Sequence, residues 1–549
     1  MLGRTFLFAF ILISLAALVS AKPSALDISV EPAGSAYRVS VTFTGEADGS
    51  TDIRLPNEWG GQQELFKAIR NVSVSKGATL SETDKPFLRS ITHQPGQRIT
   101  VTYEIAQDFQ GPLTNAIRYR PVTDAQYVHW IGNTVWVLPE WDEQVDNDVS
   151  IEWKGFPKTW TVANSFASTR RKQKFQAKLP ELLSAIFVAG DFRIATTKAK
   201  GNDITVAIRG KWQFADTDLA EMIRKVLETE RDFFADHSQK YYLVTLVQTD
   251  EGPNAISLGG TGLTNSFALF ATPNATISRF RGLLGHEYVH NWIPGRLGRM
   301  PEPEQELYWF SEGFTEFYTY KLLYRGGLIT PAEYAEAYND RIREYYRLPV
   351  RNASNDRIVA DFWTDRNVQR LPYLRGFLFA TNLDAEIARS SGGSASLDDA
   401  VRELLAASKT SSQPLSFESL TAAFSKHVGR DLASDINRQL KEGELVIPVA
   451  DALGSSFSQR TTEMPIFELG FNFDKFAKDR VVADLDPNSS AYAAGLRNGQ
   501  KRNGGVSLAF GDASKEVELK VKDDEGEKTI KFLPVSRERL QIPQYQLNP

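Results

Sequence analysis

A short run of residues with metal-binding chemistry stands near the middle of the chain. His286 and His290 are four residues apart, and the carboxylate of Glu287 directly follows the first of them. On an α-helix, residues i and i+4 lie on the same face, so both imidazoles can reach one metal ion while Glu287 stands beside them. The spacing therefore predicts a helix that supplies two ligands to one metal ion.

A third ligand is expected from a second helical stretch further along the chain. A zinc site that keeps one position for water takes three protein ligands, and Glu312 lies 22 residues after His290 in an apolar segment that could pack against the first helix. Glu316, one helical turn later, is predicted to accept the outer N–H of a ligating histidine and so fix its tautomer. Two imidazoles and one carboxylate are a ligand set that suits zinc best.

These residues resemble the glycyl aminopeptidase family of gluzincin zinc metallopeptidases. The matching stretches are H-E-Y-V-H-N-W at 286–292, W-F-S-E-G-F-T-E-F-Y at 309–318 and P-Y-L-R-G at 372–376. The resemblance implies one Zn²⁺ per chain, held by His286, His290 and Glu312. It also implies that Glu287 is the general base on a zinc-bound water and that Tyr373 stabilises the oxyanion.

A glycine-rich segment departs from the family pattern. Relatives read roughly G-G-L-E-H-x-N-S, and their glutamate resembles the residue that holds a free α-amino group; this chain has Gly262 at that position. A buried ammonium without a counter-charge is costly, so selection for a free N-terminus is expected to weaken. Gly259, Gly260 and Gly262 are still predicted to bind substrate, in an edge strand to which extended peptide backbone can add.

The C-terminal residues 451–549 have the pattern of a PDZ-like β domain. Leu469, Gly470 and Phe471 resemble the loop in which backbone N–H groups cradle the C-terminal carboxylate of a peptide. Residues 486–496 resemble the short helix and turn of bacterial PDZ modules. The resemblance implies a C-terminal peptide as a ligand of this domain, and the alternative is a module that only packs on the catalytic domain.

Hydrophobic periodicity divides the rest of the chain into a β region and a mixed region. Alternating apolar residues, as at 37–43, predict a β-sandwich-like N-terminal domain at 22–192. Strand and helix patterns predict the catalytic domain at 193–450, with a helix expected to start at 371–376. The resemblance implies that this domain is thermolysin-like, with an α/β part followed by helices. The expected fold class is therefore α+β multidomain.

The N-terminus predicts export from the cell. Residues 1–21 contain Arg4, an apolar run and a small-residue ending at Ala21, which is the pattern of a secretory signal peptide. We therefore expect a secreted or periplasmic bacterial protein with no integral membrane segment after signal cleavage. The chain has no cysteine, so its stability does not depend on disulfides.

Charge and motifs together define the expected partners. The chain has 63 basic and 68 acidic residues without a long run of one sign, which argues against a nucleic-acid partner. The expected function is a secreted zinc metallopeptidase acting on peptides or proteins, aminopeptidase-like by resemblance. One alternative is a zinc endopeptidase that does not recognise a free N-terminus, which Gly262 favours. The other is a non-catalytic periplasmic peptide-binding PDZ protein, against which the intact set of metal-site residues counts.

Overall fold

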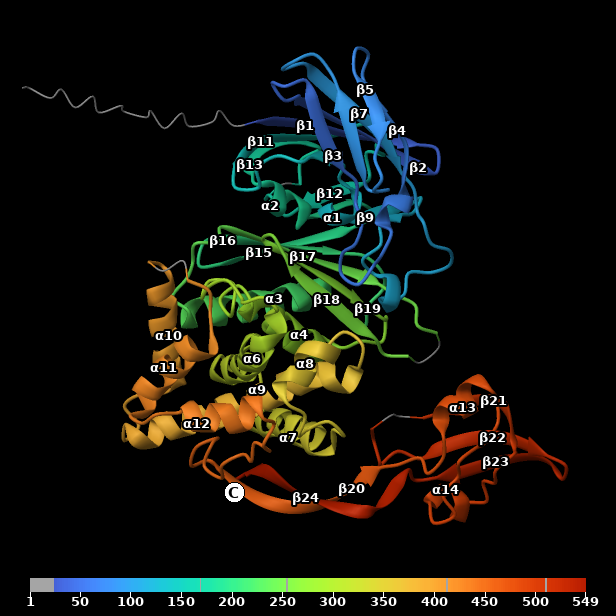
Figure 1. Cartoon of the computed structure of the whole chain (residues 1–549), viewed down its shortest axis with the longest axis vertical. Coiled ribbons are helices and arrows are strands. Elements are labelled where there is room, and N and C mark those ends of the chain that lie inside the picture. The colour runs from blue at the N-terminus through green and yellow to red at the C-terminus, as the bar shows by residue number, and fades with distance from the viewer. Residues whose placement is uncertain (1–23, 168, 253–254, 411–412, 509–510) are drawn as a thin grey trace, which may run out of the picture. The chain divides into compact units, whose positions relative to one another are not determined.

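The chain is a mixed α+β protein of two compact units (Figure 1). The computed structural model describes residues 24–167, 169–252, 255–410, 413–508 and 511–549. The predicted signal peptide at 1–21 lies outside these residues. The first unit contains the chain up to Thr196 together with Asp203–Gln213 and Tyr241–Ala275. The second unit contains Thr197–Asn202, Phe214–Lys240 and Thr276–Pro549.

The N-terminal part of the first unit is built from β-sheets. A 6-stranded sheet, in the order β13-β11-β1-β2-β7-β4, contains β1 (Ala25–Ala33), β2 (Ala36–Thr44), β4 (Ile69–Val74), β7 (Arg98–Ile105), β11 (Asn147–Trp153) and β13 (Lys172–Ala177). A 4-stranded sheet, in the order β10-β3-β6-β5, contains β3 (Ser50–Arg54), β5 (Thr79–Glu82), β6 (Leu88–Thr92) and β10 (Leu138–Pro139). Another, in the order β12-β14-β9-β8, contains β8 (Val122–Thr123), β9 (Tyr127–Ile131), β12 (Thr161–Asn164) and β14 (Ile186–Gly190). Short helical turns connect them at η1 (Leu65–Ala68), η2 (Asn115–Ile117), α1 (Gly132–Val135) and α2 (Leu179–Leu183).

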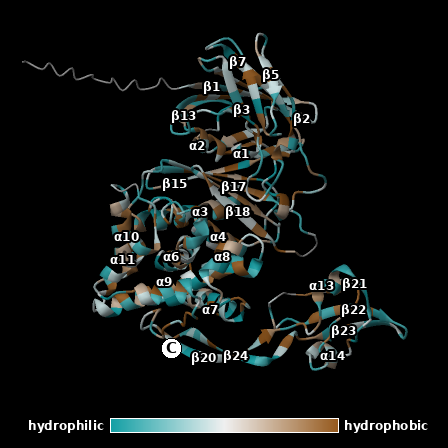
Figure 2. Ribbon diagram, in the orientation of Figure 1, coloured by the Kyte–Doolittle hydropathy of each residue, from teal (hydrophilic) through white to brown (hydrophobic). Residues whose placement is uncertain are grey.

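The alternating pattern of the sequence explains how these strands form a core. In the pairing of β2 with β7, Val41 lies opposite Val101 and Phe43 lies opposite Ile99. All four side chains are fully buried, because every second residue of a strand points to the same face. Hydrophobic and hydrophilic residues are interleaved along the same elements in Figure 2, as this arrangement requires.

A 5-stranded sheet, in the order β15-β16-β17-β19-β18, follows in the first unit. Residues Thr197–Asn202, where β15 ends and β16 begins, are counted with the second unit. Its strands are β15 (Arg193–Ala199), β16 (Asn202–Ile208), β17 (Tyr241–Gln248), β18 (Leu258–Leu263) and β19 (Ser266–Ala271). β16, β17 and β19 are parallel, and their residues are almost all buried. β18 lies at the sheet edge and pairs antiparallel with β19 alone.

The second unit is mainly helical. Its helices are α3 (Asp216–Phe233), α4 (Ile277–Val289), η3 (Glu304–Leu307), α5 (Tyr308–Ser311), α6 (Gly313–Arg325), α7 (Pro331–Arg347), α8 (Asn355–Asp361), α9 (Arg366–Ser390), α10 (Leu397–Ser408), α11 (Phe417–Val428), α12 (Ala433–Ile436) and the π-helical turn η4 (Asn437–Lys441). Local sequence signals set several of the starts. At α7, Thr330 and Glu333 form a capping box, and Pro331 occupies the first helical position, where its missing N–H costs no hydrogen bond.

Helix α9 begins earlier than the sequence suggests. The expectation that residues 371–376 start a helix is wrong, because α9 starts at Arg366 and Pro372 lies inside it. The side chain of Asp365 accepts the N–H of Asn367 over 2.8 Å and provides the helix start. A proline inside a helix removes one hydrogen bond and crowds the carbonyl of residue i−4, yet α9 continues past Pro372 to Ser390.

The C-terminal part of the second unit contains a two-stranded ribbon and a small sheet. β20 (Phe457–Phe467) pairs antiparallel with β24 (Val535–Leu547), so residues 468–534 lie between the paired ends of the ribbon (Figure 1). These residues contain α13 (Phe473–Lys478), α14 (Ser490–Ala493) and a 3-stranded sheet of β21 (Lys501–Ser507), β22 (Val517–Asp523) and β23 (Gly526–Phe532) around their own hydrophobic cluster.

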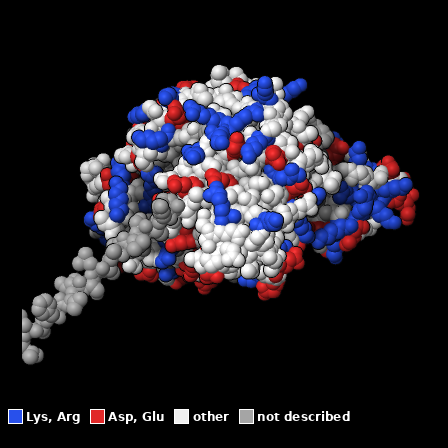
Figure 3. Space-filling model, turned by 90° about the horizontal axis from the view of Figure 1, so that it is seen from above, with Lys and Arg blue, Asp and Glu red and all other residues white. Residues whose placement is uncertain are grey.

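The surface of the molecule carries both signs of charge. Basic and acidic side chains are interspersed on the face seen in Figure 3, and the whole chain has a formal net charge of −5. Within the described ranges, the helices are too short or too polar for any of them to span a bilayer.

Candidate metal centre

Helix α4 packs one face against neighbouring helices and carries the two histidines outside that face. Phe280, Leu284 and Tyr288 recur every four residues and are almost fully buried where α4 meets its neighbours α3 and α6. His286 and His290 lie off this stripe, with ring centroids 4.8 Å apart. His290 follows the last helical residue but keeps helical backbone angles (φ −58°, ψ −18°), so the spacing of four still brings both rings together.

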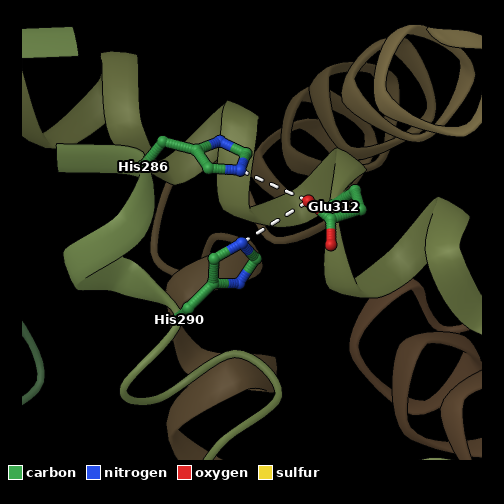
Figure 4. Close-up of side chains that lie close together, drawn as sticks. All are labelled: His286, His290 and Glu312. Carbon is green, nitrogen blue, oxygen red and sulfur yellow. Dashed lines mark hydrogen bonds and ion pairs between the residues drawn. The ribbon is translucent and has the colours of Figure 1, made fainter. Parts of the chain in front are cut away.

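Glu312 reaches the histidines from the junction between α5 and α6. Its Oε2 lies 3.3 Å from Nε2 of His286 and 3.4 Å from Nε2 of His290 (Figure 4). One possible ligand atom from each of the three residues lies within 4.8 Å of the others. The structure therefore brings together the three residues predicted from the sequence as metal ligands.

The outer nitrogen of each imidazole is held by an oxygen atom. His286 Nδ1 lies 2.9 Å from Oε2 of Glu316, and His290 Nδ1 lies 2.9 Å from the carbonyl oxygen of Ile293. A carbonyl or a carboxylate accepts but does not donate, so both Nδ1 atoms donate, and in the neutral form of each imidazole Nε2 carries a lone pair. In that form two lone pairs and a carboxylate oxygen converge, an arrangement that a cation satisfies.

The electrostatics of the cluster favour a positive charge. Burial opposes the charged form of His286, but the hydrogen bonds and charges of Glu312 and Glu316 raise its pKa to about 10. Burial would raise the pKa of Glu312, but His290 and His286 hold it well below its ordinary value. The site thus attracts a proton or a metal ion. Because two imidazoles and one carboxylate form a typical catalytic zinc set, the residues present fit a zinc ion.

Glu316 is itself fixed by a residue that sequence reasoning missed. Arg341 of α7 donates from Nη2 and Nε to Oε1 of Glu316, over 2.6 and 2.8 Å. The other oxygen of this buried carboxylate faces His286. Burial would raise the pKa of Glu316, but Arg341 and then His286 hold it well below its ordinary value. The sequence shows only a cation beside the apolar residues of α7, and this pattern does not identify the partner.

Tyr373 reaches the same cluster from α9. Its ring stacks on that of His286, with centroids 5.9 Å apart and 20° between the planes. Burial, then Glu312 and less strongly Glu287, raise the pKa of the Tyr373 phenol well above its ordinary value. The phenol therefore stays protonated and can donate a hydrogen bond. Glu287 is half-buried on α4, directly beside the first histidine.

Two glycines allow α9 to pack closely against α5 and α6, which adjoin the metal ligand Glu312. A Cβ on Gly376 would overlap the carbonyl oxygen of Trp309 in α5, and a Cβ on Gly313 would overlap the backbone of Gly376. Only glycine leaves room for backbones this close. The spacing in P-Y-x-x-G then has a physical reason, because Gly376 permits the helix contact and Tyr373, one turn earlier, lies against His286.

The glycines predicted to bind substrate lie in the first unit, whereas the metal ligands lie in the second. Gly259, Gly260 and Gly262 belong to the edge strand β18. Tyr119 donates to the carbonyl oxygen of Gly260 over 2.7 Å, and Asn115 donates to another carbonyl of the same strand over 3.3 Å. A peptide that adds to this part of the edge would have to displace these hydrogen bonds.

The loop that resembles a PDZ carboxylate site is tightly packed. Gly470 has a φ of +75°, which favours glycine, and a Cβ there would overlap Ser489. Leu469 and Phe471 belong to the small hydrophobic cluster, with only 8% and 9% of their surface exposed. The loop continues into α13, so residues 473–478 do not offer the extended strand beside which a peptide would add.

Comparisons with known proteins match this site and the fold. Residues 279–370 match the family model described as M61 glycyl aminopeptidase. Among solved structures, an aminopeptidase N family protein from Idiomarina loihiensis is 17% identical, with a TM-score of 0.71 over 95% of this chain and 98% of that chain. An M1 zinc metallopeptidase from Deinococcus radiodurans is 16% identical, with a TM-score of 0.45 over 78% of this chain and 96% of that chain. No curated protein matches the chain.

The comparisons and the geometry agree on the class of protein. The likeness to the Idiomarina structure shows a shared fold along nearly the whole chain. The family match includes both histidines, Glu312, Glu316 and Arg341, and therefore the whole set of residues built around the converging acceptor atoms. This segment of the chain is therefore similar to M61 glycyl aminopeptidases, and the match covers residues 279–370.

Proposed function

We propose that the chain hydrolyses peptide bonds as an aminopeptidase-like zinc enzyme and that His286, His290 and Glu312 hold the metal ion. The observation that carries this proposal is the convergence of one possible metal-ligand atom from each of these three side chains. A bound zinc ion would polarise the scissile carbonyl and lower the pKa of the attacking water.

Glu287 is the proposed general base. It directly follows His286 on α4, and it is not one of the three converging residues. It takes a proton from the attacking water and passes it to the nitrogen of the leaving amine, so that the amine departs uncharged when the C–N bond breaks. A carboxylate beside the ligands, with no ligand role of its own, suits this shuttle.

Tyr373 is the proposed donor to the oxyanion. Its phenol keeps its proton because its pKa lies well above the ordinary value. It can therefore donate a hydrogen bond to the oxygen that gains negative charge when water attacks the carbonyl. The stacking of its ring on that of His286 supports this role.

We also propose the finer organisation and location of the chain. A β-sandwich-like domain at 22–192, a thermolysin-like catalytic domain at 193–450 and a PDZ-like domain at 451–549 are supported by the paired sheets, the helical metal centre and the small 3-stranded sheet. Secretion or a periplasmic location is supported by the signal-like pattern at 1–21.

A second candidate, a zinc endopeptidase, is favoured by one observation. The family pattern has a glutamate at the position of Gly262. Glycine has no charged side chain, so residue 262 would not hold the free ammonium group of a substrate. The two candidates differ in the substrate end that they require. An aminopeptidase acts only on free N-termini, whereas an endopeptidase also cuts blocked peptides.

The experiment uses the purified protein loaded with zinc and a pool of short peptides with free or acetylated N-termini. The products are identified by mass spectrometry, and Glu287→Gln serves as the control for a contaminating protease. Removal of single residues from free peptides alone would support the aminopeptidase, and internal cleavage of both pools would support the endopeptidase. No cleavage of either pool would contradict the proposed function.

A further inference from the structure

Helix α7 joins the metal centre to the last strand of the chain. On one side of α7, Arg341 holds Glu316, whose other oxygen holds Nδ1 of His286. On another side, Asn339 and Tyr545 of β24 exchange two hydrogen bonds. The amide of Asn339 donates to the Tyr545 carbonyl over 2.8 Å, and the Tyr545 N–H donates to Asn339 Oδ1 over 2.7 Å. Both residues are buried.

Further contacts fix the same strand on the same helix. Arg343 donates to Oε1 of Gln544 in β24 over 2.7 Å. The Tyr545 hydroxyl donates to the carbonyl oxygen of Val449 over 2.6 Å, and its ring lies edge-on to Tyr338 of α7, with centroids 6.3 Å apart. The contacts of Tyr338, Asn339 and Arg343 with β24 use neighbouring turns of α7, so they fix both the position of α7 along its axis and its rotation.

The contact between Arg341 and Glu316 needs this precision. A guanidinium is a planar fork with fixed N–H directions, so a small rotation of its helix breaks at least one of its hydrogen bonds. Arg341 is also oriented by Tyr320, which accepts a hydrogen bond from Nη2 and whose ring centroid lies 4.2 Å from the guanidinium carbon. A buried carboxylate that loses such a partner is left without its counter-charge, and its orientation is no longer defined.

We propose that Arg341 is a positioning residue for the zinc site and that the C-terminal strand β24 holds it in place through α7. The proposal rests on the proposed function, because it concerns the orientation of a metal ligand. Arg341 orients Glu316, Glu316 orients the imidazole of His286, and β24 determines where α7 presents Arg341. The last strand of the chain thus belongs functionally to the metal centre.

The first test compares zinc affinity in the full-length protein. Arg341→Gln is expected to raise the zinc dissociation constant about tenfold, which is the lower end of the effect of removing an outer partner of a metal ligand. Arg341→Lys keeps the positive charge but loses the planar pair of N–H donors. Its zinc dissociation constant should therefore lie between those of Arg341→Gln and wild type. Arg347→Gln removes a cation from the last turn of α7 that has no contact with Glu316, and its dissociation constant should equal that of wild type.

The second test asks whether β24 acts through Arg341. Asn339→Ala is expected to weaken zinc binding severalfold in the wild-type background and to have little further effect in the Arg341→Gln background, because the two residues act along one path. Zinc dissociation constants are measured by competition with a chromogenic chelator, and the melting temperature of each metal-free variant is recorded in parallel. A merely structural role would lower the melting temperature and leave the dissociation constant unchanged.

The outcomes separate this inference from the proposed function. A wild-type protein that takes up no zinc would overturn the proposed metal site and this inference with it. If the wild-type protein binds zinc and both Arg341→Gln and Arg341→Lys bind it as tightly as wild type does, the inference is overturned but the proposed function is not. Equal effects of Asn339→Ala in both backgrounds would show that β24 does not act through Arg341, which overturns the part assigned to the strand.

Discussion

At the scale of single residues, the metal centre is defined by which atoms are already engaged. His286 and His290 each donate their outer N–H to an oxygen, so their inner nitrogens are left to face Glu312. The phenol of Tyr373 keeps its proton next to these acceptors, so it is a donor at a place where other side chains accept. The acceptor atoms can bind a metal ion, and the phenol can donate a hydrogen bond to an oxyanion.

Replacement of Tyr373 by phenylalanine tests the donor role. Tyr373→Phe should lower kcat by about 10²- to 10³-fold, the usual effect of removing one oxyanion donor, with zinc content unchanged. Steady-state kinetics and metal analysis check this result. Tyr346→Phe on α7 removes a phenol outside the metal centre and should keep the wild-type kcat. If both variants were equally active, Tyr373 would have no part in the reaction.

A buried acidic residue of α3, Glu230, lies close to α4. Glu230 of α3 is 1% exposed, and neither of its carboxylate oxygens has a hydrogen-bond partner among the described residues. Gly285, directly before His286, makes room for it, because a Cβ at that position would lie 3.2 Å from Glu230 Oε1. Burial raises the pKa of Glu230 well above its ordinary value of 4.5.

This raised pKa predicts how stability depends on pH. Because the carboxyl group holds its proton more tightly in the folded protein, its contribution is fully present below its ordinary pKa of 4.5 and is lost as pH rises towards the folded value. Glu230→Gln cannot ionise, so it should reduce the loss of unfolding free energy that occurs as the pH rises above the ordinary pKa of the carboxyl group. Chemical denaturation of the metal-free proteins measures this slope.

A surface carboxylate on the same helix provides the control. Glu228 of α3 forms an ion pair with Arg224, and Glu228→Gln should leave the pH slope almost as in wild type. A slope in Glu230→Gln identical to wild type would show that Glu230 is already ionised in the folded protein.

At the scale of elements, the decisive contact is between α9 and the α5–α6 junction. Gly376 and Gly313 let the backbones meet, and this contact carries Tyr373 to His286. Gly376→Ala should lower the unfolding free energy by about 2 kcal/mol, because the added methyl group meets backbone that cannot move aside. It should also lower kcat, since any shift of α9 displaces Tyr373.

The matched control is a glycine in an open helical position. At Gly282 of α4, the nearest atom to an added Cβ is the Tyr320 hydroxyl oxygen at 3.4 Å. Gly282→Ala should therefore stabilise the protein by about 0.5–1 kcal/mol through helix propensity. Thermal and chemical denaturation distinguish the two variants, and a Gly376→Ala protein as stable as wild type would contradict the close contact.

The elements also show what the sequence can and cannot predict. The spacing of His286 and His290 and the capping of α7 are local patterns, so they were predictable from neighbouring residues alone. The pairing of Arg341 with Glu316 and the contact of Gly376 with Trp309 depend on how helices pack, and they leave no local signal. A helix start was expected at 371–376, whereas α9 starts at Arg366, directly after the cap residue Asp365.

At the scale of the whole molecule, the last strand serves the helical region as well as its own ribbon. β24 pairs with β20 along its length and exchanges hydrogen bonds with α7 near its C-terminal end. Periodicity predicts the strands of the C-terminal region, but it does not predict their partners. The boundary at 451 therefore describes a change in sequence character, while the final residues pack against the helix that holds Arg341.

The proposed metal centre is a zinc site in which Glu287 acts as a base and is not a ligand. Zinc content and peptide hydrolysis are measured for the wild-type protein and Glu287→Gln side by side. We expect one zinc ion per chain in both proteins, with hydrolysis reduced at least about 100-fold in the variant. Hydrolysis by Glu287→Gln at the wild-type rate, or a wild-type chain that takes up no zinc, would contradict this proposal.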